Sequence, residues 1–168
     1  MKKVIVGLFI LGLTTQLFAQ NTNIEELPTV VLHNVNYKYL SDVNINNEAQ
    51  IVEFLQNEVA SFNLKNTDVY DDEESKYEIY FMIPDGYILA NYNNEGKITS
   101  TLERFNNSKL PPTVLRSVTD NYPGWSISKN TYSVTYNHGK GAAKSYKLIL
   151  ENGDQRIRVK TDGNGKIL

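Results

Sequence analysis

An internal repeat constrains the fold of this chain more than any other feature of the sequence does. Shifting the chain so that Tyr77 falls on Tyr146 aligns residues 77–98 with residues 146–167 without a gap, and six of these 22 positions are identical. Chance would give about one or two identities. The identical pairs are Tyr77 and Tyr146, Asp85 and Asp154, Ile88 and Ile157, Gly96 and Gly165, Lys97 and Lys166, and Ile98 and Ile167. We therefore predict that one structural unit occurs twice.

Each copy is predicted to begin with a helix. Before the first copy, residues 46–62 carry apolar side chains at three-and-four spacing behind the cap candidates Asn46 and Asn47. In the second copy, Asn107 or Ser108 is the cap candidate. The next residues supply two prolines for a first turn and then an apolar stripe: Pro111, Pro112, Val114, Leu115 and Val118. Pro123-Gly124 is predicted to end this second helix.

Alternating apolar patterns then predict short strands joined by turns in each copy. The expected strands are 67–71, 76–82, 87–92 and 97–105, followed by 125–136, 143–151, 155–161 and 165–168. The stretches "NNEGK" and "DGNGK" are predicted to be glycine-bearing hairpin turns. A change in alternation predicts a β-bulge or bend near Lys129 to Thr131, after the inward-facing Trp125 and Ile127. The expected fold class is α+β, with two tandem repeats, each a helix packed on a roughly four-stranded antiparallel sheet.

The first twenty residues, "MKKVIVGLFILGLTTQLFAQ", have the pattern of a secretory signal peptide. Lys2 and Lys3 form a positive start, Val4 to Leu13 form an apolar run of ten residues that is too short to span a bilayer, and Ala19 suits signal peptidase. We therefore predict cleavage after Ala19 and a secreted or periplasmic protein. The alternative is a retained membrane anchor or a buried helix, and no stop-transfer pattern follows to favour it.

The predicted organisation has four parts. They are a signal peptide over 1–19, an N-terminal strand and irregular segment over 20–47, a degenerate first repeat over 48–105 and a second repeat over 106–168. In the N-terminal segment we expect a strand over Val30 to Leu32. An irregular stretch should follow, in which Tyr37, Tyr39 and Leu40 pack on the domain.

Composition excludes several classes of protein. The absence of cysteine excludes disulfides, thiolate metal sites and lipid attachment at a lipobox cysteine. Without Lys2 and Lys3, 15 basic residues face 19 acidic ones, so the processed chain has a formal charge of −4. Nucleic acid is therefore not an expected partner, because phosphate binding relies on clustered positive charge.

No motif predicts catalysis, a metal or a cofactor. "DGNGK" ends too close to the C-terminus to be a twelve-residue calcium loop, and "GKGAAKS" (139–145) lacks the glycine before lysine and the following helix of a phosphate loop. The acidic run in "DVYDDEES" (68–75) is typical of a solvated loop, with weak calcium or cationic-partner binding as the alternative. His33 and His138 have neither a nucleophile motif nor a zinc-ligand spacing beside them. We predict a protein that is not an enzyme.

The candidate binding residues come from two strands of the repeat. In "RIRVK", Ile157 and Val159 face one side of the strand, and Arg156, Arg158 and Lys160 face the other. Tyr87 and Leu89 occupy outward positions in the first copy. One half of the exposed sheet should thus be basic and the other half aromatic or apolar. Solvation alone would explain such a face, but Arg and Tyr also dominate the hot spots of protein interfaces.

The second copy resembles a known family. The run "LPPTVLRSVTDNYPGWSISK", a strand with a tyrosine, and the closing "DGNGKIL" are similar to the PepSY-like family of exported bacterial proteins, also described as beta-lactamase-inhibitor-like. The likeness is most specific over residues 109–168 and covers 48–105 in degenerate form, with "FNL" (62–64) in place of Tyr-Pro-Gly-Trp.

The resemblance implies a helix on a four-stranded antiparallel sheet in each copy, with the two sheets forming a curved tandem surface. In the inhibitor after which the family is described, the concave sheet grips a partner protein. The family supplies no catalytic residues to carry over, and fold resemblance alone does not transfer inhibition.

Three functions remain open at this point. The first is binding of an envelope or secreted protein or peptide through the exposed sheet, with inhibition of the partner as one form of it. The second is binding of a small amphiphile or envelope polymer in a cleft between helix and sheet. The third is an envelope hydrolase whose catalytic group is assembled from distant residues.

Overall fold

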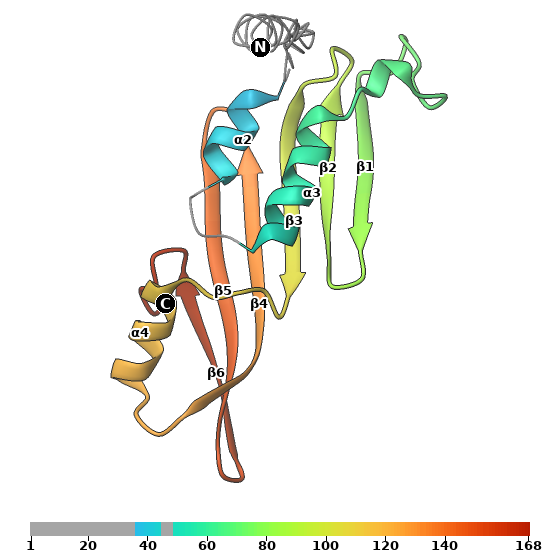
Figure 1. The fold of residues 1–168 in the computed structure, drawn as a ribbon. Helices are drawn as coiled ribbons and strands as arrows, with labels where there is room; N and C mark the ends of the chain where they lie inside the picture. Colours follow the sequence, from blue (N-terminus) through green and yellow to red (C-terminus); the bar gives the residue numbers. More distant parts are fainter. Residues whose placement is uncertain (1–35, 45–48) are drawn as a thin grey trace, which may run out of the picture. The chain divides into compact units, whose positions relative to one another are not determined.

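Six strands form one antiparallel sheet, and their order in the sheet is their order in the sequence (Figure 1). A computed structural model describes residues 36–44 and 49–168, which belong to a single compact unit over 33–168. The strands are β1 (Lys76–Ile83), β2 (Gly86–Asn93), β3 (Ile98–Asn106), β4 (Ser126–Asn137), β5 (Gly141–Asn152) and β6 (Gln155–Asp162).

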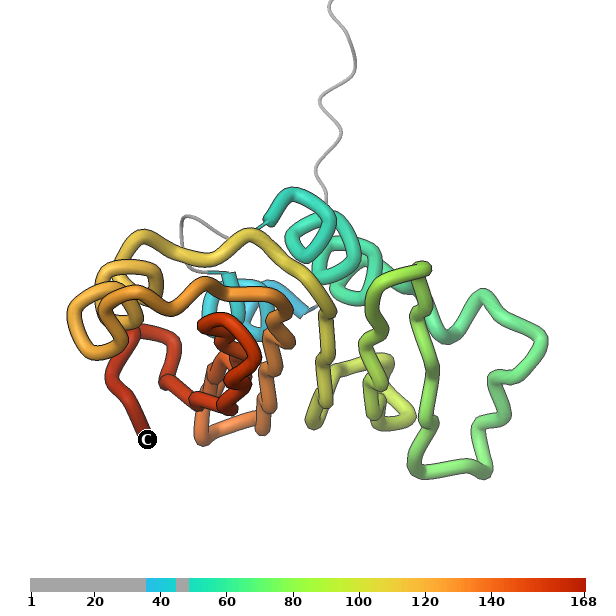
Figure 2. The backbone as a smooth tube through the Cα atoms, turned by 90° about the horizontal axis from the view of Figure 1, so that it is seen from below, coloured from blue at the N-terminus to red at the C-terminus, as the bar shows by residue number. Residues whose placement is uncertain are grey.

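The helices of this unit bury one face of the sheet. The helical elements are α2 (Tyr37–Val43), α3 (Gln50–Ser61), the short 3-10 helix η1 (Leu64–Asn66) and α4 (Pro112–Asn121). Figure 2 shows α3 lying on one side of the first three strands. Val52, Val59, Val114 and Val118, from α3 and α4, are at most 3% exposed and belong to one hydrophobic core with the sheet. The predicted α+β class with an antiparallel sheet is therefore confirmed.

The prediction of four strands in each copy is wrong at two places. Residues 67–71 do not form a strand, because η1 precedes them, turns follow, and the Thr67 hydroxyl donates to the carbonyl of Leu64 at 2.7 Å. At the C-terminus, Ile167 makes only an isolated bridge to Thr161, one residue before the chain shown here stops. The six remaining strands coincide with the predicted ranges to within two residues at each end. They form a single six-stranded sheet.

Both predicted helices exist, but neither has the predicted cap. α3 begins at Gln50 with Ala49 at its N-cap, and Asn46 and Asn47 lie outside the described residues. α4 has Pro111 at its N-cap, and Pro112 is in its first turn as predicted. Ser108 lies three residues before this N-cap, and its hydroxyl donates to the side chain of Asn130 at 3.3 Å. A second Asn130–Ser108 hydrogen bond, from the Asn130 amide to the Ser108 carbonyl at 3.0 Å, fixes the same segment against β4.

The segment predicted to be irregular before α3 is the helix α2. Tyr39 is 1% exposed and Leu40 packs against the core, as expected, whereas Tyr37 is 69% exposed. Short helices gain most of their stability from packing of an apolar face rather than from intrinsic propensity, so a seven-residue helix gives a weak signal in the sequence. The predicted strand over Val30 to Leu32 lies outside the described residues.

The two repeated turns have the same hydrogen bonds, which confirms their predicted role as glycine-bearing turns. After β2, the Asn93 side chain accepts from the backbone N–H groups of Glu95 and Lys97 at 3.1 and 2.9 Å. After β6, Asp162 accepts from the N–H groups of Asn164 and Lys166, both at 2.9 Å. Both turns also place a glycine at positive φ, +78° at Gly96 and +90° at Gly165. This conformation favours glycine.

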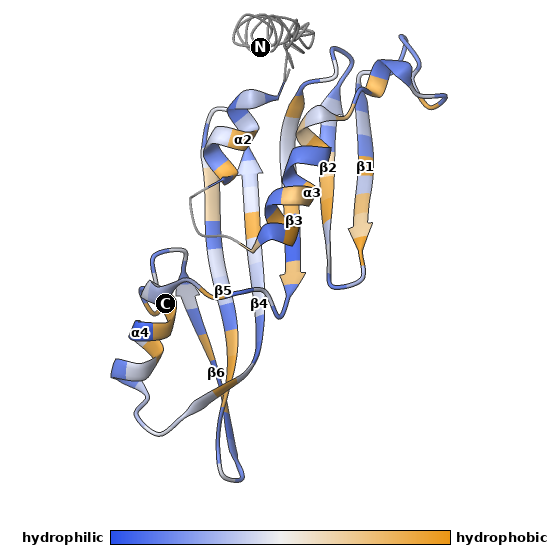
Figure 3. Cartoon of the chain, viewed as in Figure 1, coloured by the Kyte–Doolittle hydropathy of each residue, from blue (hydrophilic) through white to orange (hydrophobic). Residues whose placement is uncertain are grey.

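β4 contains the predicted bulge, slightly earlier than expected. The register with β5 shifts between Ile127 and Lys129, so the extra residue is Ser128. Trp125 and Ile127 are half-buried and pack on the core, as predicted. After the bulge, Tyr132, Val134 and Tyr136 are at most 1% exposed. Figure 3 shows hydrophobic colour in separate bands along β4 and β5, with paler or hydrophilic stretches between them.

Candidate functional site

Among the elements that the structure describes, the helices cover one face of the sheet and leave the other face open. On β2, Ile88, Ala90 and Tyr92 are fully buried, so Tyr87 and Leu89 point to the opposite side. Cross-strand pairs carry this assignment across the sheet, because directly opposite residues share a face. One row joins Tyr87, Arg104, Ser133, Ser145 and Asp162 from β2 to β6. The predicted residues Tyr87, Leu89, Arg156, Arg158 and Lys160 all occupy open-face positions.

One half of the open face carries an apolar patch. We give this name to five side chains of β1, β2 and β3: Tyr80, Met82, Tyr87, Leu89 and Leu102. Tyr80, Met82 and Leu102 are 59%, 75% and 46% exposed. The rings of Tyr80 and Tyr87 are 6.4 Å apart and tilted. Leu89 lies between Tyr80 and Leu102 in the register, so the patch is continuous.

The other half carries a basic pocket of about 690 Å³. Its cationic side chains are Arg104, Lys129, Lys147, Arg158 and Lys160, from β3, β4, β5 and β6. The remaining lining residues are Asp85, Asn106, Asn107, Asn130, Thr131, Leu148, Ile149 and Val159. Five cations and one carboxylate therefore line the same pocket. Within the described part of the chain, no carboxylate lies within ion-pair distance of any of the five.

Of the three predicted basic residues, two line the basic pocket and one does not. Arg158 and Lys160 line the pocket. Arg156 does not, and its Nε lies 3.5 Å from Glu151 Oε1 on the neighbouring strand. Sequence reasoning missed Arg104, Lys129 and Lys147, although alternation offered a signal for Lys147, which stands between the apolar residues Tyr146 and Leu148.

The apolar patch and the basic pocket are contiguous. Tyr87 of the patch is directly opposite Arg104 of the pocket across the β2–β3 pair. Figure 2 shows α3 on one side of the strands, and these open-face side chains lie on the other. The arrangement can present an aromatic surface and concentrated positive charge to the same binding partner.

The buried face holds a polar cluster that sequence reasoning also missed. Glu103 of β3 is fully buried. Its Oε1 accepts from the hydroxyls of Tyr39 and Thr101 at 2.8 and 2.9 Å, and its Oε2 accepts from the Gln56 amide at 2.8 Å. Burial, together with the neighbouring carboxyl of Glu103, raises the pKa of Tyr39 well above that of an ordinary tyrosine. The cluster ties α2 and α3 to β3.

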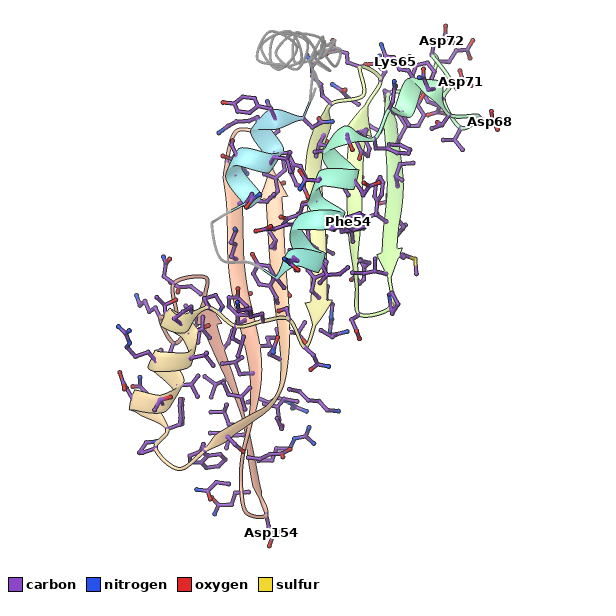
Figure 4. The ribbon with its side chains drawn as sticks, viewed as in Figure 1. Phe54, Lys65, Asp68, Asp71, Asp72 and Asp154 are labelled. Carbon is purple, nitrogen blue, oxygen red and sulfur yellow. The ribbon has the colours of Figure 1, made fainter. Side chains whose placement is uncertain are left out.

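The other sequence candidates lie apart from the open-face site. The acidic run is an exposed loop before β1. Figure 4 shows Asp68, Asp71 and Asp72 at the end of the sheet where β1 begins. The Tyr136 hydroxyl and the Nδ1 of His138 are 3.4 Å apart beside the β4–β5 turn, and His33 lies outside the described residues. Among the side chains that the structure describes, no three His, Cys, Asp or Glu residues are grouped as a metal site.

Comparison with known proteins gives no relative from which a function could be carried over. Neither a scan of protein-family models nor a search of curated proteins finds a match to this chain. In residues 36–44 and 49–168, no helix has the length and apolar character needed to cross a membrane.

Proposed function

We propose that this chain is an exported, non-enzymatic binding protein that engages a protein or peptide through the open face of its sheet. The observation that carries this proposal is the exposed apolar patch. Tyr80, Met82 and Leu102 leave a large part of their apolar surface in water, although the same chain buries its other strand face under helices. Contiguous exposed apolar groups rimmed by polar ones mark interaction surfaces.

The chemistry of this face suits a protein partner. Tyrosine and arginine are enriched among the residues that dominate interface energetics, and the patch and the pocket place Tyr80, Tyr87 and Arg104 within one surface. The strands β2 to β5 are paired on both sides, so this part of the surface is held in place and loses little conformational entropy on binding. A partner that covers both halves would gain apolar burial from one and charge complementarity from the other.

The proposal includes a tandem PepSY-like organisation. The β1–β2 and β5–β6 hairpins occupy the sequence segments that align at the repeat, and the turns after β2 and β6 share the same set of hydrogen bonds. These features support a duplicated unit whose two hairpins now lie at the two edges of one sheet. Inhibition of the bound partner is one form that such binding can take.

Export rests on the signal-peptide pattern and has its own test. The protein isolated from cells that express the full sequence should begin at Gln20, because cleavage is expected after Ala19. Intact-mass measurement and N-terminal sequencing of the protein from the medium and from the envelope fraction will locate it. An intact Met1 terminus in all fractions would contradict export.

Partner capture tests the binding face directly. We expect the purified protein to retain a partner from envelope and secreted extracts of its own organism, and we expect Met82→Glu with Leu102→Glu to lose it. The two carboxylates would have to be buried without partners in the complex. Leu115→Glu is the matched control, because Leu115 is 44% exposed on α4 and lies away from the open face.

The outcomes separate the proposed function from its alternatives. Equal capture by the patch variant and by the Leu115→Glu control would remove the open face from the interface. Turnover of envelope substrates by the purified protein would replace the binding proposal with a hydrolase. Retention of an amphiphile instead of a protein would favour the small-ligand alternative.

A further inference from the structure

We propose that the basic pocket binds an acidic peptide segment, presented in extended conformation by the partner. This inference rests on the proposed function and names the chemistry that selects the partner. Its carrying observation is that five cations from four adjacent strands line one pocket with a single carboxylate, Asp85, at the wall.

The arrangement of the cations is unfavourable in the absence of an anion. Lys147 of β5 is directly opposite Lys160 of β6, and like charges directly opposite each other on a sheet destabilise it. Lys129 and Arg158 lie on either side of Ile149 in the next row. Elsewhere on the same hairpin, Arg156 is directly opposite Glu151. This cross-strand pair combines a cation with a carboxylate, whereas the Lys147–Lys160 pair combines two cations. A bound anion would relieve the repulsion between Lys147 and Lys160.

The spread of the charges favours a chain of carboxylates over a single small anion. Arg104 is on β3 and Lys160 is on β6, three strand spacings away, which is about 14 Å. A single phosphate or sulfate could contact both residues only if their side chains extended toward each other across β4 and β5. In an extended peptide, every second side chain faces the same way at intervals of about 6.8 Å, so three alternate carboxylates span about 14 Å.

The neutral lining groups fit the same ligand. Asn106, Asn107 and Thr131 line the pocket and offer amide and hydroxyl groups that can hydrogen-bond to a peptide backbone. Two of these groups are already oriented, because the Thr131 hydroxyl donates to the Asn106 side chain at 3.2 Å. Ile149 adds an apolar contact on the open face.

The experiment uses an end-labelled peptide of alternating glutamate and serine, with three glutamates, and a peptide of alternating glutamine and serine as the uncharged probe. Binding to the full protein is followed by fluorescence anisotropy. We expect the acidic peptide to bind and the uncharged one not to bind. The affinity should fall as sodium chloride rises from about 50 mM to about 500 mM, because exposed charges are screened at the higher concentration.

Matched variants locate the site on the β5–β6 pair. Lys147→Gln combined with Lys160→Gln should weaken the acidic peptide at least about tenfold, whereas Arg156→Gln should leave its affinity within about twofold. The double variant should unfold at the same or a higher temperature than the unchanged protein, because it removes the repulsion between the two lysines. Loss of binding is then not a loss of folding.

Three results would overturn the inference. The peptide could fail to bind, it could bind all variants equally, or tripolyphosphate could bind the pocket when the peptide does not, which would assign the site to phosphate chemistry. If the peptide fails and the patch variant still loses its captured partner, the proposed function stands and only the acidic character of that partner is wrong.

Discussion

Glu103→Leu should lower the free energy of unfolding by about 3 to 5 kcal/mol, because the substitution removes the acceptor shared by three buried donors. The hydroxyls of Tyr39 and Thr101 and the amide of Gln56 all donate to this carboxyl. A buried polar group without a partner costs about 1 to 3 kcal/mol, and part of that cost is recovered if Thr101 finds another acceptor. Urea unfolding followed by fluorescence measures the loss.

Glu103→Gln is the matched control and should cost less than about 1.5 kcal/mol. The Oε1 of Gln56 is buried and has no hydrogen-bond partner. Rotation of the Gln56 amide would turn that oxygen toward residue 103, where the new amide nitrogen can donate to it. The single oxygen of the new side chain would still accept from Tyr39 and Thr101. If leucine is tolerated as well as glutamine at this position, the cluster does not hold α2 and α3 on the sheet.

The position of Glu103 also shows why alternation alone could not predict the buried face of β3. In "TLERF", the apolar residue Leu102 stands beside the charged pair Glu103 and Arg104, so the pattern reads as leucine inside and glutamate outside. The structure has the reverse, with Glu103 fully buried and Leu102 46% exposed. A register shift at the start of β3 determines which of its side chains are buried. Asn91 is opposite Ser100 whereas Tyr92 is opposite Ile98, so one residue of β3 is skipped and the alternation changes face after it.

β2, β5 and β6 could be predicted because their patterns and their turns agree. Their buried residues recur at every second position, and the turns after β2 and β6 carry glycine where φ is positive. The basic pocket could not be predicted, because it requires β3 of the first copy to pair with β4 of the second. No local pattern specifies which strands become neighbours across α4, and this pairing brings Arg104 to the same pocket as Arg158.

The predicted strand over 67–71 shows the limit of local propensity. Val69 and Tyr70 are typical strand residues, yet Val69 is 60% exposed and Tyr70 stacks on Tyr77 with ring centroids 5.7 Å apart. β1 is the edge of the sheet, and the preceding segment is held by its own turns and by η1 instead of by a further strand. Strand propensity measures the fit to a partly buried pleated surface, and that surface is absent here.

Gly165→Ala should destabilise the protein by about 3 kcal/mol or more, and Gly96→Ala by about 1 to 2 kcal/mol, although the two glycines occupy equivalent turns. Both have positive φ, which costs an alanine about 1 to 2 kcal/mol. A Cβ at Gly165 would lie 2.7 Å from the carbonyl oxygen of Thr113 and 3.1 Å from the backbone nitrogen of Val114, whereas nothing lies within 4 Å of a Cβ at Gly96.

The difference between the two variants measures how firmly α4 rests on the last turn. The atoms that a Cβ at Gly165 would meet belong to the backbone of the first turn of α4, so they can move only if the helix moves. Val114 and Val118 are at most 3% exposed beneath that helix, and lifting it would expose them. Urea unfolding of both variants should therefore show a gap of at least about 1 kcal/mol. Equal destabilisation would mean that the N-terminus of α4 yields without loss of its buried contacts, and that the close packing at Gly165 does not stabilise the fold.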